Sequence, residues 1–327
     1  MPFEIIKPGT HFDFISKWKV CAALSVTLLL LAALAVPIRG VRLGVDFAGG
    51  TEMLVRFADD SPVTESEIRE VLAEQGVPDA VVVRFRDLGA AEFSVRFAGE
   101  PGEKGEHVDH LKEALASRFG ELHVDRVEFV GPRVGAELRR DGINALLLAS
   151  LLILGYVAFR FSARFAPGAV VALIHDVSVT AGIFVMLGLE FDLRVLAALL
   201  AILGYSLNDT IIVYDRIREN MEVRTKADLP EVLNLSVNQT LSRTILTSST
   251  TMLAVLSLLI LGGEVLRPFA LAMTIGIVVG TYSSIYIAAP VLLFLEQRFG
   301  DAGHARTASP KAKAKAASGA KRKHNRA

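Results

Sequence analysis

The sequence has a single cysteine, Cys21, among its 327 residues, so no disulfide can form within the chain. It also lacks the signatures of common enzymes, because it contains no H-E-x-x-H, no P-loop, no G-x-S-x-G and no dinucleotide fingerprint. Net charge is absent as well, since 35 Lys and Arg residues balance 35 Asp and Glu residues. We therefore expect no hydrolytic active site, no metal centre, no ATP-driven step by this chain alone and no nucleic-acid partner.

Apolar residues, by contrast, are abundant: 52% of the chain is hydrophobic and the mean hydropathy is +0.44. This composition is too apolar for an ordinary soluble domain, and it excludes disorder over the whole chain because the apolar surface must be buried. A helix needs about 20 apolar residues to cross a bilayer, and lipid offers no partner to unpaired backbone groups. Six stretches qualify as spanning helices: 18–38, 142–160, 168–189, 195–214, 241–262 and 268–295.

The neutral total hides an uneven distribution of charge. Residues 41–138 carry a net charge of −9, whereas 297–327 carry +8. With six spans, both termini and nearly all the Lys and Arg residues that flank the spans fall on one side, which the positive-inside rule makes cytoplasmic. We therefore predict a cytoplasmic segment 1–17, a first span 18–38, an extracytoplasmic domain 39–141, a five-span bundle 142–296 and a basic disordered tail 297–327.

Two points about the ends of the chain stay open. Ala33-Leu34-Ala35 fits the A-x-A pattern of a signal-peptidase site, so cleavage is an alternative to retention of the first span. The length of the apolar run favours retention. The basic tail is expected to contact anionic membrane lipids, and contact with an acidic partner such as RNA is the less favoured alternative.

The predicted extracytoplasmic domain alternates strand and helix patterns. Two amphipathic helices separate the strands, and Thr64 and Glu67 form a capping box at the start of the first. A turn near Gly89 joins the middle two of four strands, 51–57, 80–86, 91–97 and 123–130. The order βαββαβ is that of a ferredoxin-like domain. The expected fold class is thus a bundle of six transmembrane helices with one α+β ferredoxin-like extracytoplasmic domain.

Charged residues inside the spans are costly, by at least about 2.5 kcal/mol each, and such residues usually have a role or a partner. Asp209 and Arg243 both lie about 10 Å from the cytoplasmic end of consecutive antiparallel spans, which makes them a plausible pair. Such a pair either takes up and releases a proton beside a permanently charged arginine, or is a static ion pair that fixes helix register. The chemistry of the two residues leaves both alternatives open.

Polar residues also share a helical face with Arg243. Thr247, Thr250 and Thr251 follow it at helical spacing, and we expect this stripe to face the bundle or a water-filled path rather than lipid.

A third ionisable position, Asp176, is expected to form hydrogen bonds within the bundle. A metal pair with His175 is not expected, because adjacent helical residues do not share a face and no third ligand follows. Gly276 and Gly280 form a G-x-x-x-G motif, which is more typical of close helix packing than of a ligand site.

Five segments of the sequence together form a specific pattern: GVDFAGGT (44–51), VGPRVGAEL (130–138), FRFSARFAPGAVVALIHDV (159–177), GYSLNDTIIVYDRIREN (204–220) and NQTLSRTILTSSTT (238–251). Together they resemble the SecF family, the smaller membrane subunits of the bacterial SecD–SecF protein-export complex. They occur in the family's order and cover nearly the whole chain except the basic tail. The family belongs with the RND-type transporters.

The resemblance implies a multi-pass protein of the bacterial inner membrane that acts with a separate SecD partner. Together they would use the proton-motive force to help preproteins cross and leave the SecYEG channel, with protons in place of any cofactor. Asp209 and Arg243 match the family's proton-relay residues. The other implied site residues are Asn208, Thr247 and Asp176 as supporting polar groups, and Asp46, Gly49 and Gly50 as the family motif of the outer domain.

Two other functions remain as alternatives. An RND-type proton-coupled exporter of a lipid or small molecule would need substrate grooves in a larger outer region, and the predicted outer domain is single and compact. A non-coupled scaffold of the Sec channel would retain its activity when Asp209 is replaced by Asn.

Overall fold

The computed structural model describes residues 11–57, 63–85, 91–98, 106–161, 165–224 and 227–307. Within these ranges, six helices are long and apolar enough to cross a membrane, as the sequence predicts. Most of these helices are longer than the apolar runs in the sequence, because polar residues continue the helix past the ends of the runs. The spans cover Ile15–Arg39, Pro132–Arg160, Ala166–Leu187, Leu193–Val223, Leu229–Leu261 and Val265–Arg298.

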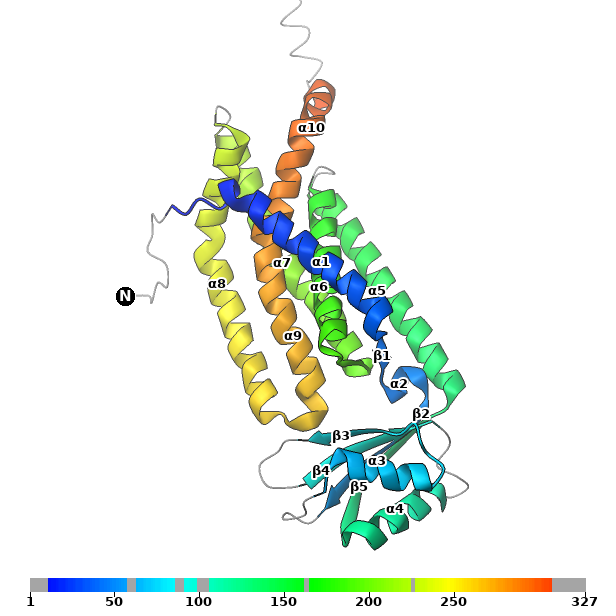
Figure 1. The fold of residues 1–327 in the computed structure, drawn as a ribbon. Helices are drawn as coiled ribbons and strands as arrows, with labels where there is room; N and C mark the ends of the chain where they lie inside the picture. The colour runs from blue at the N-terminus through cyan, green and yellow to red at the C-terminus, as the bar shows by residue number, and fades with distance from the viewer. Residues whose placement is uncertain are drawn as a thin grey trace, which may run out of the picture.

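The helices form a bundle that Figure 1 shows above a smaller α+β domain. The start of the second span differs from the prediction, because the helix begins with Pro132 in its first turn, well before the predicted start at 142. Proline is tolerated there because its missing N–H would have no partner in a first turn. The helices are α1 (Trp18–Arg39), α5 (Pro132–Arg160), α6 (Ala166–Leu187), α7 (Leu193–Val223), α8 (Leu229–Leu261) and α9 (Gly263–Ser283).

The helices α6, α7 and α9 form the centre of the bundle, whereas α1, α5 and α8 are buried along little of their length. Close approach between α7 and α9 depends on the predicted G-x-x-x-G motif. A Cβ at Gly276 would lie 2.2 Å from a side-chain carbon of Ile202, and a Cβ at Gly280 would lie 3.0 Å from the Cβ of Ser206. The prediction of close helix packing at this motif is therefore confirmed.

After α9 the chain makes one π-helical turn, η3 (Ser284–Ala288), and continues as α10 (Ala289–Thr307). The first part of the segment predicted to be disordered, 297–307, is therefore helical. Residues 308–327 and the predicted turn near Gly89 lie outside the described residues.

The described residues of the smaller domain form four strands and two helices in the predicted order. All neighbouring strands are antiparallel, in the spatial order β3-β4-β2-β5. The two helices cover one face of the sheet, and the other face is turned towards the bundle (Figure 1). The elements are β2 (Gly50–Phe57), α3 (Glu65–Glu74), β3 (Val81–Phe85), β4 (Ala91–Phe97), α4 (Glu106–Phe119) and β5 (Leu122–Val130).

The core of this domain follows from strand alternation and helix amphipathicity. Met53, Val55 and Phe93 from the sheet are fully buried against Leu72 of α3 and Leu111 of α4. At the start of α3 the predicted capping box is present: Glu67 N donates to Thr64 Oγ1 at 3.4 Å, and Thr64 N donates to Glu67 Oε2 at 2.9 Å. The pattern thus locates both the buried face and the helix start.

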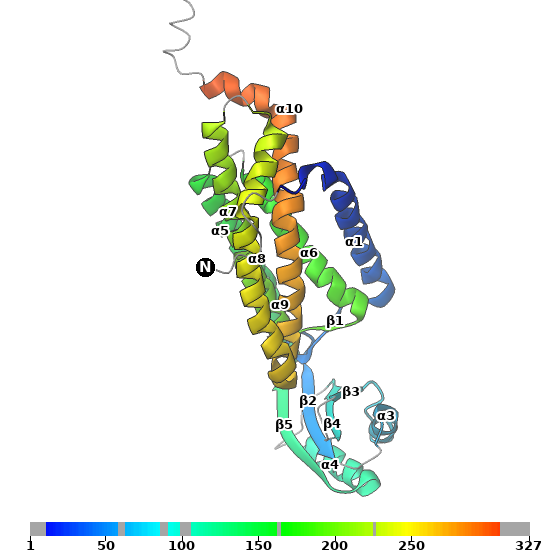
Figure 2. The ribbon, with the colours of Figure 1, turned by 90° about the vertical axis from the view of Figure 1, so that its left-hand side faces the viewer.

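The first helix, α1, crosses the bundle obliquely and lies against α6 (Figures 1 and 2). At its start, η1 (Ile15–Lys17) and the preceding residues are held by α8: Asn238 and Asn234 donate to the carbonyl of Phe12 at 2.8 and 3.0 Å, and Asn234 accepts from Phe14 N at 2.8 Å. At its far end, β1 (Arg42–Leu43) pairs in parallel with β6 (Glu190–Phe191). The helix is therefore tied to the bundle at both ends.

Candidate functional site

The Asp209 side chain lies in the middle of α7 and is only 1% exposed. One carboxylate oxygen, Oδ1, is buried without a hydrogen-bond partner among the described residues. The other, Oδ2, lies 3.4 Å from the Ser248 hydroxyl of α8, a long distance for an O–H···O bond. A buried carboxylate with so few donors is strongly under-solvated.

Ser248 belongs to a buried stripe of hydroxyl residues on α8. These residues recur every fourth position, so they lie one above another on one helix face. This spacing is visible in the sequence, but the stripe predicted from the sequence is the one that contains Arg243, on a neighbouring face of α8. The members are Ser236, Thr240, Thr244 and Ser248, each less than 10% exposed.

The sequence predicts a polar stripe on α8 that faces the bundle or a water-filled path. Its members are Arg243, Thr247, Thr250 and Thr251. Arg243 and Thr250 are exposed on the outside of the bundle, and Thr247 and Thr251 are partly buried. The three threonine hydroxyls donate to backbone carbonyls of their own helix. The stripe therefore does not lie wholly inside this chain, and its expected contact with the bundle or a water-filled path rather than lipid stays a prediction.

The predicted pair of Asp209 and Arg243 is not in contact. No ion pair within 4.0 Å joins them in the described part of the chain, although the Arg243 charge lies near enough to act on the Asp209 carboxylate. Packing turns Asp209 inwards and Arg243 outwards. The supporting residue Asn208 is also exposed, because it precedes Asp209 by one position and so points about 100° away.

A second buried carboxylate, Asp176 of α6, has the opposite environment. Its Oδ2 accepts hydrogen bonds from Ser206 of α7 and from Ser283 of α9, the latter at 2.7 Å. Its Oδ1 lies 2.9 Å from Nδ1 of His175. The prediction of hydrogen bonding inside the bundle is confirmed, whereas the expectation that these adjacent residues would not meet is wrong.

The outer-domain motif acts at the junction with the bundle. Asp46 Oδ2 accepts a hydrogen bond from Leu193 N at 3.0 Å, at the first residue of α7, next to the cap that Asp192 supplies to Val195 N. Gly49 and Gly50 have φ values of +77° and +126°. A Cβ on Gly50 would lie 2.6 Å from the Phe97 carbonyl oxygen, so this position requires glycine.

Ion pairs also cross this junction. Arg96 of β4 pairs with Glu190 of β6 and approaches Glu52 at 3.6 Å. Burial lowers the pKa of the Arg96 guanidinium, and the charge of Glu52 opposes this shift. A cavity of about 640 Å³ lies between the bundle and the sheet face that carries no helices. Its lining contains Arg and Glu as well as apolar side chains. The outer domain therefore rests on the bundle through polar contacts.

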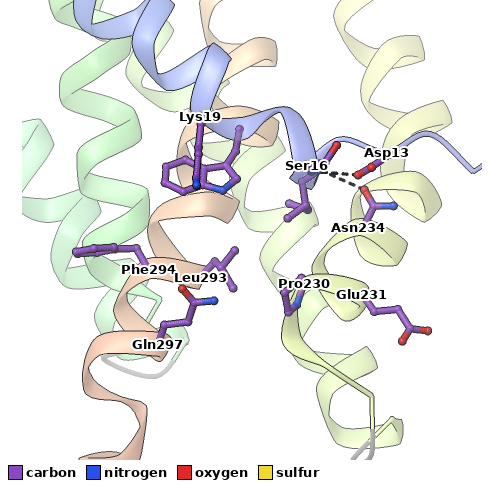
Figure 3. Close-up of a pocket in the computed structure, with 11 residues that line it drawn as sticks. Asp13, Ser16, Lys19, Pro230, Glu231, Asn234, Leu293, Phe294 and Gln297 are labelled. Atoms are coloured by element: carbon purple, nitrogen blue, oxygen red, sulfur yellow. Dashed lines mark hydrogen bonds between the residues drawn. The ribbon is translucent and has the colours of Figure 1, made fainter.

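At the opposite end of the bundle, a second cavity of about 570 Å³ lies beneath the start of α1 (Figure 3). Lys19 of α1 borders it on one side, Phe294 of α10 on another and Pro230 of α8 on a third, and Trp18 of α1 also lines it. Among the described residues, no group of three or more His, Cys, Asp or Glu side chains is placed to hold a metal ion.

Two family models, several known proteins and two solved structures match this chain. Residues 110–298 match the family described as "Protein export membrane protein SecD/SecF, C-terminal", and residues 34–60 match the "SecD/SecF GG Motif". A "Protein translocase subunit SecF" of Pseudomonas aeruginosa is 45% identical over 291 residues, covering 89% of this chain and 93% of that protein. The chain belongs to the SecF family.

Further SecF relatives include one from Desulfurispirillum indicum, 42% identical over 88% of this chain and 93% of its own length. The crystal structure of SecDF from Thermus thermophilus, titled a translocon-associated membrane protein, superposes with a TM-score of 0.81 at 41% identity. It covers 90% of this chain, which spans 40% of the SecDF chain. A SecDF crystal structure in a "Super-membrane-facing form" gives a TM-score of 0.67 at 39% identity.

The matched glycine motif at 34–60 contains Asp46, Gly49 and Gly50, and the structure gives these residues a physical role at the domain junction. The chain is therefore a multi-pass membrane protein of the protein-translocase SecF type.

Proposed function

We propose that this chain, together with a SecD partner, couples proton movement across the bacterial inner membrane to preprotein export through SecYEG. Asp209 would be the group that takes up and releases the proton, and no other cofactor would be needed. The observation that carries this proposal is the contrast between the two buried carboxylates. In the part of the chain that the structure describes, Asp176 has donors on both oxygens, whereas Asp209 has one long contact and one oxygen without a partner.

The contrast separates a structural carboxylate from a functional one. A buried carboxylate that accepts hydrogen bonds on both oxygens gains little free energy when it is protonated. A buried carboxylate with too few donors is unfavourable while it is charged, and protonation removes that cost. Arg243 stays charged in both states and supplies a field that favours the carboxylate. Uptake and release of a proton at Asp209 would therefore change the balance of forces between α7 and α8.

Asn208 and Arg243 are exposed near the middle of the spanning helices α7 and α8. Charged and polar side chains facing lipid are unfavourable, so this surface is the one that we expect SecD to cover. The three supporting polar residues predicted from the sequence then have different roles. Asn208 would contact the partner, the Thr247 hydroxyl donates to a carbonyl of its own helix, and Asp176 holds the bundle together.

The positions of the basic residues support an orientation of the chain in the membrane. We infer that the end of the bundle that carries Lys17, Lys19, Arg216, Arg218 and Arg224 faces the cytoplasm, and that the α+β domain is extracytoplasmic. The antiparallel strand order β3-β4-β2-β5 with two helices on one face supports a ferredoxin-like assignment for that domain. The emerging preprotein would meet this domain, and the basic tail would meet anionic lipid.

The test replaces Asp209 by Asn in the full chain, co-expressed with SecD, and measures export with and without an ionophore that collapses the proton gradient. We expect the variant to lose the ionophore-sensitive part of export. The matched control is Asp215→Asn on the same helix, where the carboxylate is exposed and pairs with Arg218 at 3.2 Å. Ionophore-sensitive export that survives in Asp209→Asn would contradict proton coupling and favour the scaffold; normal export with altered lipid or small-molecule efflux would favour the RND-type exporter.

A further inference from the structure

The hydroxyl of Ser248 lies between two partners on different helices. Its Oγ is 3.4 Å from Asp209 Oδ2 on α7 and 2.7 Å from Thr281 Oγ1 on α9. The short distance is that of a good O–H···O hydrogen bond, and the long one is not. Ser248 is therefore held mainly by α9 in this arrangement, with the carboxylate within reach.

A hydroxyl can donate one hydrogen bond and accept others, so its direction depends on its neighbours. Beside a charged Asp209, Ser248 must donate to the carboxylate, and Thr281 must then donate to Ser248. Beside a protonated Asp209, the carboxyl O–H can donate to Ser248, which in turn donates to Thr281. The change of direction needs rotation of two hydroxyls; the only covalent change is the O–H bond made or broken on Asp209.

Thr281, the last residue in this series of hydrogen bonds, lies next to an irregular turn in the bundle. Thr281 lies three residues before Ser284, whose hydroxyl donates to the Thr281 carbonyl at 3.0 Å and which begins the π-helical turn η3. Ser283 between them donates to Asp176. Turns of this kind are frequent at functional sites within helices. Both buried carboxylates are therefore linked to the same turn of α9.

We propose that Ser248 and Thr281 are positioning residues that form a reversible hydrogen-bond relay, which orients the Asp209 carboxyl and reports its protonation state to α9. This inference rests on the proposed proton uptake at Asp209. In the described residues around it, the ionisable group that acts on Asp209 is Arg243 of α8, while Tyr205 of α7 and Thr244 of α8 contribute buried hydroxyls without partners.

The relay is tested by infrared difference spectroscopy on the full chain with its SecD partner, comparing acid and alkaline samples. The carbonyl band of protonated Asp209 is identified by its loss in Asp209→Asn. A carboxyl group that donates a hydrogen bond absorbs at lower frequency than a free one. We therefore expect Ser248→Ala to move the band to higher frequency, Thr281→Val to move it in the same direction, and Ser248→Thr and Thr281→Ser to restore it.

The matched control is Thr274→Val on α9, since the Thr274 hydroxyl donates to its own helix at Ala270 O, 2.8 Å away. This variant should leave the band unmoved. A band that stays in place in Ser248→Ala, or the lack of any band lost in Asp209→Asn, overturns the relay. The result is separable from the proposed function, because export assays decide proton coupling whether or not the band depends on Ser248.

Discussion

Asp46 accepts a hydrogen bond from the backbone amide of Leu193, although 147 residues separate the two in the chain. Leu193 begins α7, the helix that carries Asp209. The outer-domain motif and the candidate proton site therefore share one rigid element, with the motif's carboxylate at the positive end of the helix dipole. A force applied to the outer domain has a direct route to the buried carboxylate.

Removal of the Asp46 carboxylate should destabilise the junction, because Leu193 N at the start of α7 loses its acceptor. We expect Asp46→Ala to cost about 0.5–2 kcal/mol of stability, the usual range for loss of a side-chain acceptor at a helix start. Asp46→Asn should cost less, because its amide oxygen can still accept from the Leu193 amide. Thermal denaturation of the full chain measures both, with Asp109→Ala on the surface of α4 as the control; equal effects of the three variants would contradict the assignment.

Replacement of Gly50 by alanine should be more harmful than the same change at another glycine with positive φ. The new Cβ would meet the Phe97 carbonyl oxygen at 2.6 Å, and backbone cannot move aside as a flexible side chain can. Gly76 has φ of +85° but open space around it, so Gly76→Ala should cost only the backbone strain, about 1–2 kcal/mol. Hydrogen exchange along β2 and β4 should rise in Gly50→Ala and stay near normal in Gly76→Ala.

The two buried carboxylates should differ in what their removal costs. Asp176→Ala deprives Ser206, Ser283 and His175 of an acceptor, whereas Asp209→Ala removes a group that has one long contact. Both variants lose the same atoms, so the cavity terms are comparable. We expect Asp176→Ala to be less stable than Asp209→Ala by about 1–3 kcal/mol, the cost of unsatisfied buried polar groups. Equal denaturation midpoints would argue against the division into structural and functional carboxylates.

The capping box of α3 should make the first turn of that helix sensitive to acid. Hydrogen bonds from the Thr64 side chain and amide hold the pKa of Glu67 below its usual value of 4.5. A depressed folded-state pKa stabilises the fold above pH 4.5 and loses that stabilisation as the pH falls through the folded-state value. Hydrogen exchange at the Glu67 and Ile68 amides should therefore accelerate below pH 4.5, relative to intrinsic rates. In Glu67→Gln, which accepts at every pH, the step should be absent.

The local patterns predict most of the fold. Six apolar runs locate the spans, and strand alternation together with Thr64 and Gly76 locates the elements of the outer domain, because these signals lie within a few residues of one another. Helix ends are less well predicted. The start at Pro132 lies in a polar segment, where hydropathy carries no signal and contacts with the outer-domain motif extend the helix.

The candidate site could be predicted only in part. Its residue types identify Asp209 and Asp176, but the rotation of α8 about its axis decides whether Thr247 or Ser248 faces the interior. One position turns a side chain by about 100°, and only packing against α7 and α9 selects the face. The contact between Asp46 and Leu193 is equally inaccessible to local reasoning, because its two partners belong to separate patterns.

The π-helical turn at Ser284–Ala288 has a mechanical consequence for the inner end of the bundle. A π turn accommodates one residue more than an α turn, so its conversion to regular helix would rotate everything beyond it by about 100°. The element beyond it is α10, which carries Leu293 and Phe294 at the edge of the cavity under α1. A change of hydrogen bonding at Thr281 could thus be converted into a twist of the last helix, and the gap beneath the first helix would open or close with it.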